Sequence, residues 1–349
     1  MKDRNNILGK PNLYMYPMLS TNESISKNPY VDNLCKSLVN YFNIINLNKV
    51  ARTGLLDIFK YHKHLDYIYF NWVENIPDRK AGFMQFLLFI FLINYYRAVG
   101  IKVIWTMHNK ISHSKKNYLL KKILFKTLIK KANFIFTHSS DGIDFADKII
   151  PGIGKKVIFL HHPLNNSTFN IQKRKSFDYD VIIWGTIAEY KGVNSFLQFL
   201  KEKSRQDDFK ILIIGKYQSS DYYTESLIIA GKKTQIENRF VENDELYELI
   251  SKSKTILFTY NDSSVLSSGA LMDSLMTNTE IIGPNKGAFR DLHELEILHT
   301  FNDYQELLSI LDSDQGENEI KSNAEKREEF LNDNTWEQFA RKVAKIITL

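Results

Sequence analysis

The chain has 349 residues, of which 44% are hydrophobic and 25% are charged, and this composition excludes a disordered tail and a fibrous or low-complexity protein. Because Cys35 is the single cysteine, an internal disulfide framework and a cysteine-based zinc site are excluded, and a reducing, cytosolic location is expected. The net charge of +6, from 46 basic and 40 acidic residues, favours an anionic partner.

The N-terminal residues 1–10 are polar, so we expect no secretory signal there. The longest apolar run covers residues 83–96 and is interrupted by Gln85 and Asn94. A helix needs about 20 apolar residues to cross a bilayer, and this run is shorter.

In the first half of the chain, short β-rich runs alternate with helical patterns, which predicts βαβ units and a parallel sheet. The predicted strands are residues 13–18, 43–47, 67–72, 102–107, 133–138 and 157–160. The predicted helices are residues 31–41, 55–62, 80–99, 114–131 and 141–149.

One of these helices, residues 114–131, is basic and amphipathic, with seven lysines, no acidic residue and an apolar side. Such a helix suits an anionic membrane surface, and the alternative is a helix that packs on a sheet with its lysines in solvent. Nucleic acid is the less favoured partner because no stacking aromatic residues are interleaved with the lysines.

A polar, basic run at residues 161–175 breaks the alternation, and the pattern then begins again. We therefore predict a first domain at 1–163, a linker at 164–176, a second domain at 177–330 and a C-terminal helix at 331–349. The second set of strands is predicted at 180–184, 210–214, 237–240, 255–259, 280–282 and 298–301. The second set of helices is predicted at 193–202, 222–230, 244–251, 269–276 and 303–311. The spacing of Thr335 and Gln338 is typical of a capping box that opens the C-terminal helix.

Ligands of open α/β sheets bind at the carboxyl ends of strands, so the turns that follow the strands are the candidate sites. In the turn 184–192, Gly185 allows close backbone approach, Thr186 follows it, and Lys191 can meet a phosphate. Gly215 and Lys216 follow the next strand. The alternative for each is an ordinary tight turn with a solvated lysine.

The segment 260–273 predicts a second anion site, because Ser267, Ser268 and Gly269 precede a helix with small side chains and free amides. Asp273, one helical turn further on, can accept hydrogen bonds from a ribose diol. The alternative is a serine N-cap beside a surface acid. Residues 283–288 are interpreted as a glycine-bounded loop beside the same site.

Polar residues follow the first-half strands instead, and three of them are candidate catalytic groups: Glu74, His108 and His113. Glu74 can act as a general base if it is buried and within reach of an acceptor hydroxyl. A histidine at such a place is otherwise a structural residue.

The turn 185–192, the strand that ends at Gly215, the run 267–275 and a C-terminal helix opening at Trp336 together resemble GT-B glycosyltransferases, and most of all the large group that makes bacterial polysaccharides. The resemblance implies two Rossmann-like doubly wound α/β domains with an interdomain cleft and a C-terminal helix that returns to the first domain. It also implies that the first domain, 1–163, binds the acceptor and that the second, 177–330, binds the nucleotide-sugar.

The resemblance also implies roles for single residues. Lys191 matches the lysine that contacts the donor diphosphate, Asp273 matches the acid that holds the ribose, and His108 resembles the histidine near the donor sugar. Thr186 stands where the family has arginine, and Val265 stands where it has the first glutamate of the Glu-x7-Glu motif.

The sequence therefore predicts a metal-independent hexosyltransferase without a cofactor, which moves a sugar from a nucleoside diphosphate to a glycan or lipid-linked acceptor. Its predicted place is the inner face of the cytoplasmic membrane, in capsule or exopolysaccharide synthesis. Two alternatives stay open: a nucleotide-sugar epimerase on the same architecture, and an inactive scaffold of a polysaccharide assembly complex.

Overall fold

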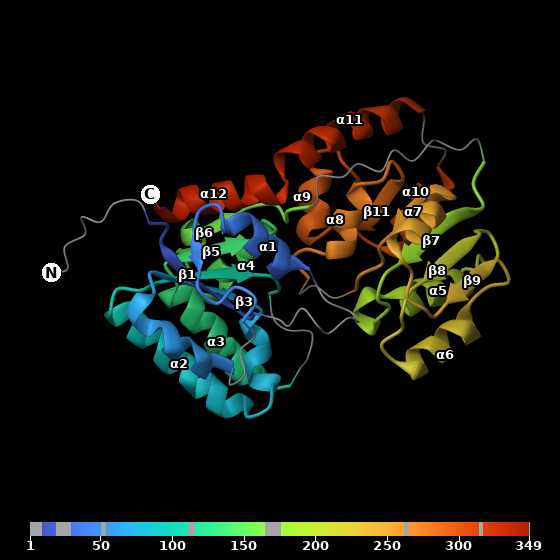
Figure 1. Ribbon diagram of the computed structural model, residues 1–349. Coiled ribbons are helices and arrows are strands. Elements are labelled where there is room, and N and C mark those ends of the chain that lie inside the picture. Colours follow the sequence, from blue (N-terminus) through green and yellow to red (C-terminus); the bar gives the residue numbers. More distant parts are fainter. Residues whose placement is uncertain are drawn as a thin grey trace. The chain divides into compact units, whose positions relative to one another are not determined.

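The computed structural model describes residues 9–18, 29–49, 54–110, 116–164, 176–261, 265–313 and 317–348. The chain forms two compact units (Figure 1). Unit 1 consists of residues 1–163 together with 334–349, and unit 2 of residues 164–333. No helix in the described ranges has the length and apolar content needed to cross a membrane.

The sheet of unit 1 is parallel throughout and has the strand order β2-β1-β3-β4-β5-β6. Its strands are β1 (Asn12–Tyr16), β2 (Asn43–Ile44), β3 (Tyr67–Asn71), β4 (Lys102–Met107), β5 (Phe134–Thr137) and β6 (Val157–Phe159). Its helices are α1 (Tyr30–Leu38), η1 (Gly54–His64), η2 (Val73–Asp78), α2 (Gly82–Ala98), α3 (Tyr118–Lys131), α4 (Asp141–Ile149), η3 (Ile153–Lys156) and α12 (Trp336–Thr348), where η denotes a 3-10 helix.

Side chains that alternate along the central strands divide the two faces of this sheet. Tyr69 and Ile104 point into the core that α1 and α12 cover. Phe70 and Trp105, one residue further along their strands, contact Phe89 of α2 and Phe125 of α3 on the other face. Helices cover both faces, so the strands are apolar on both sides, as expected of a parallel sheet.

The sheet of unit 2 is also parallel, with the order β12-β11-β10-β7-β8-β9. Its strands are β7 (Tyr179–Trp184), β8 (Ile211–Ile214), β9 (Thr234–Glu237), β10 (Ser253–Leu257), β11 (Glu280–Pro284) and β12 (His299–Phe301). Its helices are η4 (Glu189–Lys191), α5 (Val193–Glu202), α6 (Ser220–Ile229), α7 (Asn243–Ser251), α8 (Gly269–Leu275), α9 (Gly287–His293), α10 (Tyr304–Asp312) and α11 (Glu317–Asp333). Helices α5, α6 and α10 cover one face, and α7, α8, α9 and α11 cover the other.

The strand order reverses once in each sheet, and the reversal marks where a ligand is expected. In unit 2 it falls between β7 and β10, and in unit 1 between β1 and β3. At each reversal, the connections that follow the two adjacent strands run in opposite directions. The backbone between the two strand ends is therefore exposed. The turns after Trp184 and after Asn71 therefore lie at the two favoured places.

Most predicted elements lie where the sequence placed them, and four expectations were wrong in detail. The strand expected at 237–240 is β9 at Thr234–Glu237, the strand expected at 43–47 is reduced to Asn43–Ile44, and the helix expected at 55–62 is a 3-10 helix. Residues 283–288 are no loop, because β11 continues to Pro284 and α9 begins at Gly287. The segment before the C-terminal helix contains the long helix α11.

The C-terminal helix begins as the capping pattern predicts, since the Gln338 amide donates to the Thr335 hydroxyl over 3.3 Å. Helix α12 then packs on α1 in unit 1 (Figure 1). Most of the predicted linker, residues 165–175, lies outside the described residues. The assignment of acceptor and donor binding to the two halves stays a prediction.

A cluster of buried aromatic and histidine rings joins α1 and α12 to the carboxyl ends of the strands in unit 1. Tyr30 contacts the rings of His108, His138, His162 and Trp336, with centroids 4.6–5.4 Å apart. His138 Nδ1 lies 3.0 Å from the Leu160 carbonyl oxygen, which can only accept, so this nitrogen carries the hydrogen. His138 Nε2 therefore accepts from the Tyr30 hydroxyl, 2.7 Å away.

Unit 2 contains a buried arginine that holds α11 in place. Arg327 is 6% exposed and donates to the carbonyl oxygens of Thr277, Thr279 and Ile297 over 2.7–3.1 Å. Its burial lowers the pKa of the guanidinium to about 10. The three carbonyls depend on this one side chain, so removal of its donors leaves buried acceptors unsatisfied.

We expect Arg327→Leu to lower the melting temperature of the protein strongly, with a loss on the order of 3–5 kcal/mol, because a buried charged network loses its donor. Arg205→Leu is the matched control, since Arg205 pairs with the exposed Asp312 and its loss costs about 1 kcal/mol or less. Differential scanning calorimetry of both variants measures the difference. Equal melting temperatures would contradict the assignment.

The histidine cluster makes unit 1 sensitive to acid. Burial depresses the pKa of His108 and His138 well below the usual value and that of His162 to about 4. The unfolded chain then binds more protons than the folded chain below about pH 6.5. These histidines therefore leave the free energy of unfolding unchanged above that pH and lower it as the pH falls toward 4.

We expect the melting temperature to be level from pH 8 to 7 and to fall from pH 6.5 to 5. His138→Gln, which cannot protonate, removes part of this slope, whereas His293→Gln on the surface of unit 2 does not. Thermal melts of the three proteins at a series of pH values test this. A slope that His138→Gln leaves unchanged would show that other groups cause it.

Candidate functional site

The carboxyl ends of β7 and of its neighbour β8 are built on two glycines. Gly185 follows β7 with φ +97°, and Gly215 follows β8 with φ +149°, conformations that side chains rarely adopt. A methyl group on Gly215 would lie 1.8 Å from the Gly185 carbonyl oxygen. The two strand ends can therefore approach this closely only because both residues lack a side chain.

The turn after Gly185 is clamped on the segment that follows β10. The Thr259 hydroxyl donates to the Lys191 carbonyl over 2.7 Å, and the Asn261 amide donates to the Tyr190 carbonyl over 3.0 Å. Gly192 packs so closely that an added methyl group would lie 2.3 Å from the Thr259 carbonyl oxygen. These contacts fix Lys191 between the carboxyl ends of β7 and β10, at the reversal of strand order.

The Lys191 ammonium is buried at this point. The residue is 6% exposed, its Nζ would lie 3.3 Å from a methyl group placed on Gly185, and it stands over the Tyr260 ring, 5.5 Å from the centroid. No carboxylate of the described residues forms an ion pair with it, and burial lowers its pKa. A cation held in this way is suited to accept an anionic ligand.

Tyr260 connects Lys191 to the start of α8. Its hydroxyl lies 3.0 Å from the Ser268 hydroxyl, while its ring faces the ammonium. The neighbouring Ser267 hydroxyl is buried and has no hydrogen-bond partner among the described residues, and nothing lies within 4 Å of a methyl group placed on Gly269. The predicted run of small residues therefore lies near the lysine and leaves open space at Gly269.

Asp273 lies one turn further along α8, on a helix whose first residues pack over the end of β7. Ala270 Cβ would lie 3.9 Å from a methyl group on Gly185, and the Trp184 indole donates to the Ser274 hydroxyl over 3.1 Å. Burial raises the pKa of the Asp273 carboxyl to about 6. Asp273 is thus held in a poorly solvated place, where a hydroxyl donor would stabilise its charged form.

Two predicted members of this site have exposed side chains. Thr186 and Lys216 follow the strand ends but point to solvent, and the Lys216 carbonyl accepts from the Ile187 amide over 2.9 Å. Val265 is buried, next to Leu266, whose carbonyl accepts from Ala288 of α9 over 2.8 Å. The structure therefore gathers Gly185, Lys191, Gly215 and Ser268, and it leaves Lys216 as an exposed cation near Gly215.

In unit 1, Glu74 and His108 both lie at the carboxyl edge of the sheet. His108 lies 2.9 Å from the Asn71 amide oxygen through Nε2, and Trp72 stacks on its ring at 4.5 Å. Glu74 is buried and accepts from the Asn109 amide over 3.1 Å. His113 lies outside the described residues. Among the described residues, no group of three or more His, Cys, Asp or Glu side chains is arranged to hold a metal ion.

Sequence reasoning did not identify Tyr260 as a neighbour of Lys191, nor the stacking of Trp72 on the His108 ring. Trp72 has a left-handed backbone, with φ 45° and ψ 43°, which is strained for a residue with a side chain. Its sequence position directly after a buried strand was the available signal. The contacts of Tyr260 join residues that are distant in the chain, and no local pattern reveals them.

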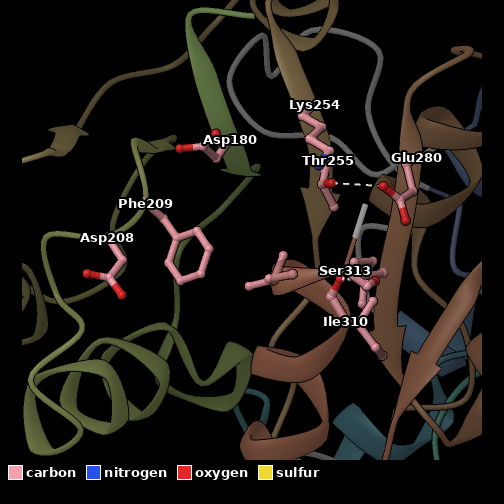
Figure 2. A pocket seen from close by; sticks show the side chains of 10 residues that line it. Asp180, Asp208, Phe209, Lys254, Thr255, Glu280, Ile310 and Ser313 are labelled. Carbon is pink, nitrogen blue, oxygen red and sulfur yellow. Dashed lines mark hydrogen bonds between the residues drawn. The ribbon is translucent and has the colours of Figure 1, made fainter. Parts of the chain in front are cut away.

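A cavity of about 190 Å³ opens at the other edge of the sheet in unit 2 (Figure 2). Asp180, Thr255 and Glu280, near the amino ends of β7, β10 and β11, contribute to its lining. Glu280 accepts from the Thr255 hydroxyl over 3.1 Å, and Asp180 accepts from the Lys210 amide over 2.7 Å. These carboxylates accept hydrogen bonds from residues at the ends of neighbouring strands. The cavity is separate from the site at Lys191.

Comparison with models of protein families and with the sequences of curated proteins found no match. Solved structures do match. The chain is 11% identical to HepE of Anabaena, solved in complex with UDP-glucose, with a TM-score of 0.68 over 97% of this chain and 99% of that one. A glycosyltransferase of Rickettsia africae gives 12% identity and a TM-score of 0.61 over 97% and 98%.

TarM is 8% identical to this chain, with a TM-score of 0.57 over 83% of this chain and 57% of TarM. At such low identity these likenesses concern the fold. Together with two parallel six-stranded sheets and a C-terminal helix packed on α1, they show that the chain has a GT-B-like fold.

Proposed function

We propose that this protein is a glycosyltransferase that moves a sugar from a nucleoside diphosphate to a glycan or lipid-linked acceptor. The observation that carries the proposal is the buried Lys191 ammonium at the strand reversal of unit 2, without a carboxylate partner among the described residues. A diphosphate supplies the negative charge that this place lacks. The fold likeness to HepE, which was solved with UDP-glucose, makes UDP-sugars the first donors to test.

In the proposed reaction the acceptor oxygen bonds to the anomeric carbon, the bond from that carbon to the diphosphate oxygen breaks, and negative charge grows on the departing phosphate oxygens. Lys191 stabilises that charge in a place where water is largely excluded, which strengthens the interaction. The Ser267 hydroxyl is a further donor, and Asp273 accepts hydrogen bonds from the ribose.

In unit 1 we assign acceptor activation to Glu74, and His108 lies at the same carboxyl edge of the sheet. Glu74 is buried there and its carboxylate accepts from the Asn109 amide, and in this proposal it takes the proton of an acceptor hydroxyl. The acceptor belongs to a bacterial surface polysaccharide in this proposal. Transfer takes place at the cytoplasmic face of a membrane.

We expect Lys191→Met to abolish stabilisation of the protein by UDP-sugars and to lower turnover by about 100- to 1,000-fold, because the charge that faces the leaving group is removed. Thermal shift with UDP-glucose, UDP-galactose and UDP-N-acetylglucosamine measures donor binding. Lys201→Met, an exposed lysine of the same unit, is the matched control and leaves both quantities unchanged.

The outcomes separate the candidate functions. Donor stabilisation with sugar transfer to an acceptor supports the proposal, and interconversion of the free nucleotide-sugars would identify an epimerase instead. No thermal response to any UDP-, GDP- or CMP-sugar favours a scaffold. Full activity of Lys191→Met overturns the assignment of the diphosphate site.

We expect Asp273→Asn to raise the melting temperature at pH 8 and to weaken UDP-sugar binding. The folded chain holds the Asp273 carboxyl at a pKa of about 6, above its unfolded value, so the charged form destabilises the protein above that pH by at most about 3 kcal/mol. The gain disappears at pH 4, where the proton is bound in the native protein. Thermal melts at both pH values, with and without donor, test this.

A stabilisation that is equal at pH 8 and pH 4 would contradict the role of charge at Asp273. Unchanged donor affinity would contradict its place in the donor site. Asp303→Asn is no suitable control, because the Asp303 side chain caps α10. Asp221→Asn, at the exposed first turn of α6, is the better one.

A further inference from the structure

The positive charge of this chain is concentrated in one part of unit 1. Residues 79–140 contain twelve Lys and Arg and no Asp or Glu, so the rest of the chain carries a net charge of −6. This acid-free stretch begins just before α2 and includes the whole of α3. Two of its cations pair with acids outside the stretch, Lys110 with Asp141 and Lys121 with Asp78, and the stretch as a whole keeps an excess of positive charge.

Helix α2 presents large apolar side chains to solvent. Phe83, Leu87 and Phe91 recur at four-residue intervals on one side of the helix, with Met84 beside them, and these four residues are 47–65% exposed. The opposite side, with Phe89 and Leu92, is buried on the sheet. An exposed apolar surface of this size is typical of an interaction site rather than of plain solvent contact.

Helix α3 packs beside α2 in the lower part of unit 1 in Figure 1 and extends this surface. Leu119 and Ile123 are exposed on it. Lys122, Lys126 and Lys130 form an exposed row at four-residue intervals directly next to them. Lys121, by contrast, points inward and pairs with Asp78 at 2.5 Å. The α2–α3 face, as we name the surface formed by these exposed residues, thus combines apolar side chains with cations.

We infer that the α2–α3 face docks on the headgroup region of a bilayer that contains anionic phospholipid. The apolar side chains of α2 enter the interface, and the lysine row of α3 meets the lipid phosphates; each such lysine contributes about 1 kcal/mol near the surface. A second copy of the chain is the less suited occupant, because a two-fold pair would bring the same positive charge of both copies together.

This inference deepens the proposed function, in which the acceptor is presented at a membrane. It rests on that function only for the biological role of the docking. Binding to lipid is measured without turnover. The two claims therefore fail separately.

The test is co-sedimentation of the full chain with unilamellar vesicles of phosphatidylcholine, with and without 30% phosphatidylglycerol. We expect binding to the anionic vesicles at low salt and a marked loss in 0.5 M NaCl, because screening weakens the lysine contribution. Wild-type protein that ignores the anionic vesicles would overturn the inference.

Two triple variants locate the contact. Phe83→Ser, Leu87→Ser and Phe91→Ser together lower the vesicle partition coefficient at least tenfold, and the matched control carries Leu227→Ser, Ile228→Ser and Phe240→Ser at exposed apolar positions of unit 2. Lys122→Gln, Lys126→Gln and Lys130→Gln together lower it about 100-fold. The control for charge is Lys201→Gln, Lys232→Gln and Lys233→Gln.

Melting temperature and UDP-sugar thermal shift of every variant accompany the binding data. A variant that keeps its donor response and loses vesicle binding supports the inference. Equal losses of vesicle binding in the test and control variants overturn it. It is also overturned if the wild-type protein does not bind vesicles but forms a dimer that the α2 variant abolishes. Vesicle binding without any donor response leaves the inference standing and contradicts the proposed function alone.

Discussion

The structure of unit 2 depends on one unfavourable burial, that of the Lys191 ammonium. Removing a cation from water costs several kcal/mol unless other groups replace the water. Here the replacement is the face of the Tyr260 ring together with the surface of Gly185. Neither supplies a full negative charge, so the positive charge of the ammonium is only partly compensated.

Two glycines, the turn and the neighbouring strand hold the lysine at this place. Gly185 adopts φ +97°, which side chains rarely permit, and a side chain on Gly215 would collide with the Gly185 carbonyl. The hydrogen bonds from Thr259 and Asn261 hold the turn to the end of β10. The strand order places this construction at the single reversal of the sheet, where helices leave the backbone uncovered.

Asp273 shows the same physics with the opposite sign. Burial disfavours the charge of both side chains, lowering the pKa of Lys191 and raising that of Asp273 to about 6. A bound ligand would stabilise the charged form of each group: an anion would stabilise the lysine, and hydroxyl donors would stabilise the carboxylate. Charged groups at binding sites are often unfavourably buried, and in the protein without ligand this lowers the free energy of unfolding.

The sequence by itself determined the alternating α/β pattern, both parallel sheets and the turn that bears Lys191, because periodicity and glycine positions are local properties. It did not determine that residues 283–288 divide between β11 and α9, since tertiary packing of Gly287 against the 265–266 backbone selects the helix start. Nor did it reveal Tyr260 over Lys191, the ring cluster of Tyr30, or which apolar side chains α2 and α3 expose. These depend on contacts between residues far apart in the chain, which only the tertiary structure decided.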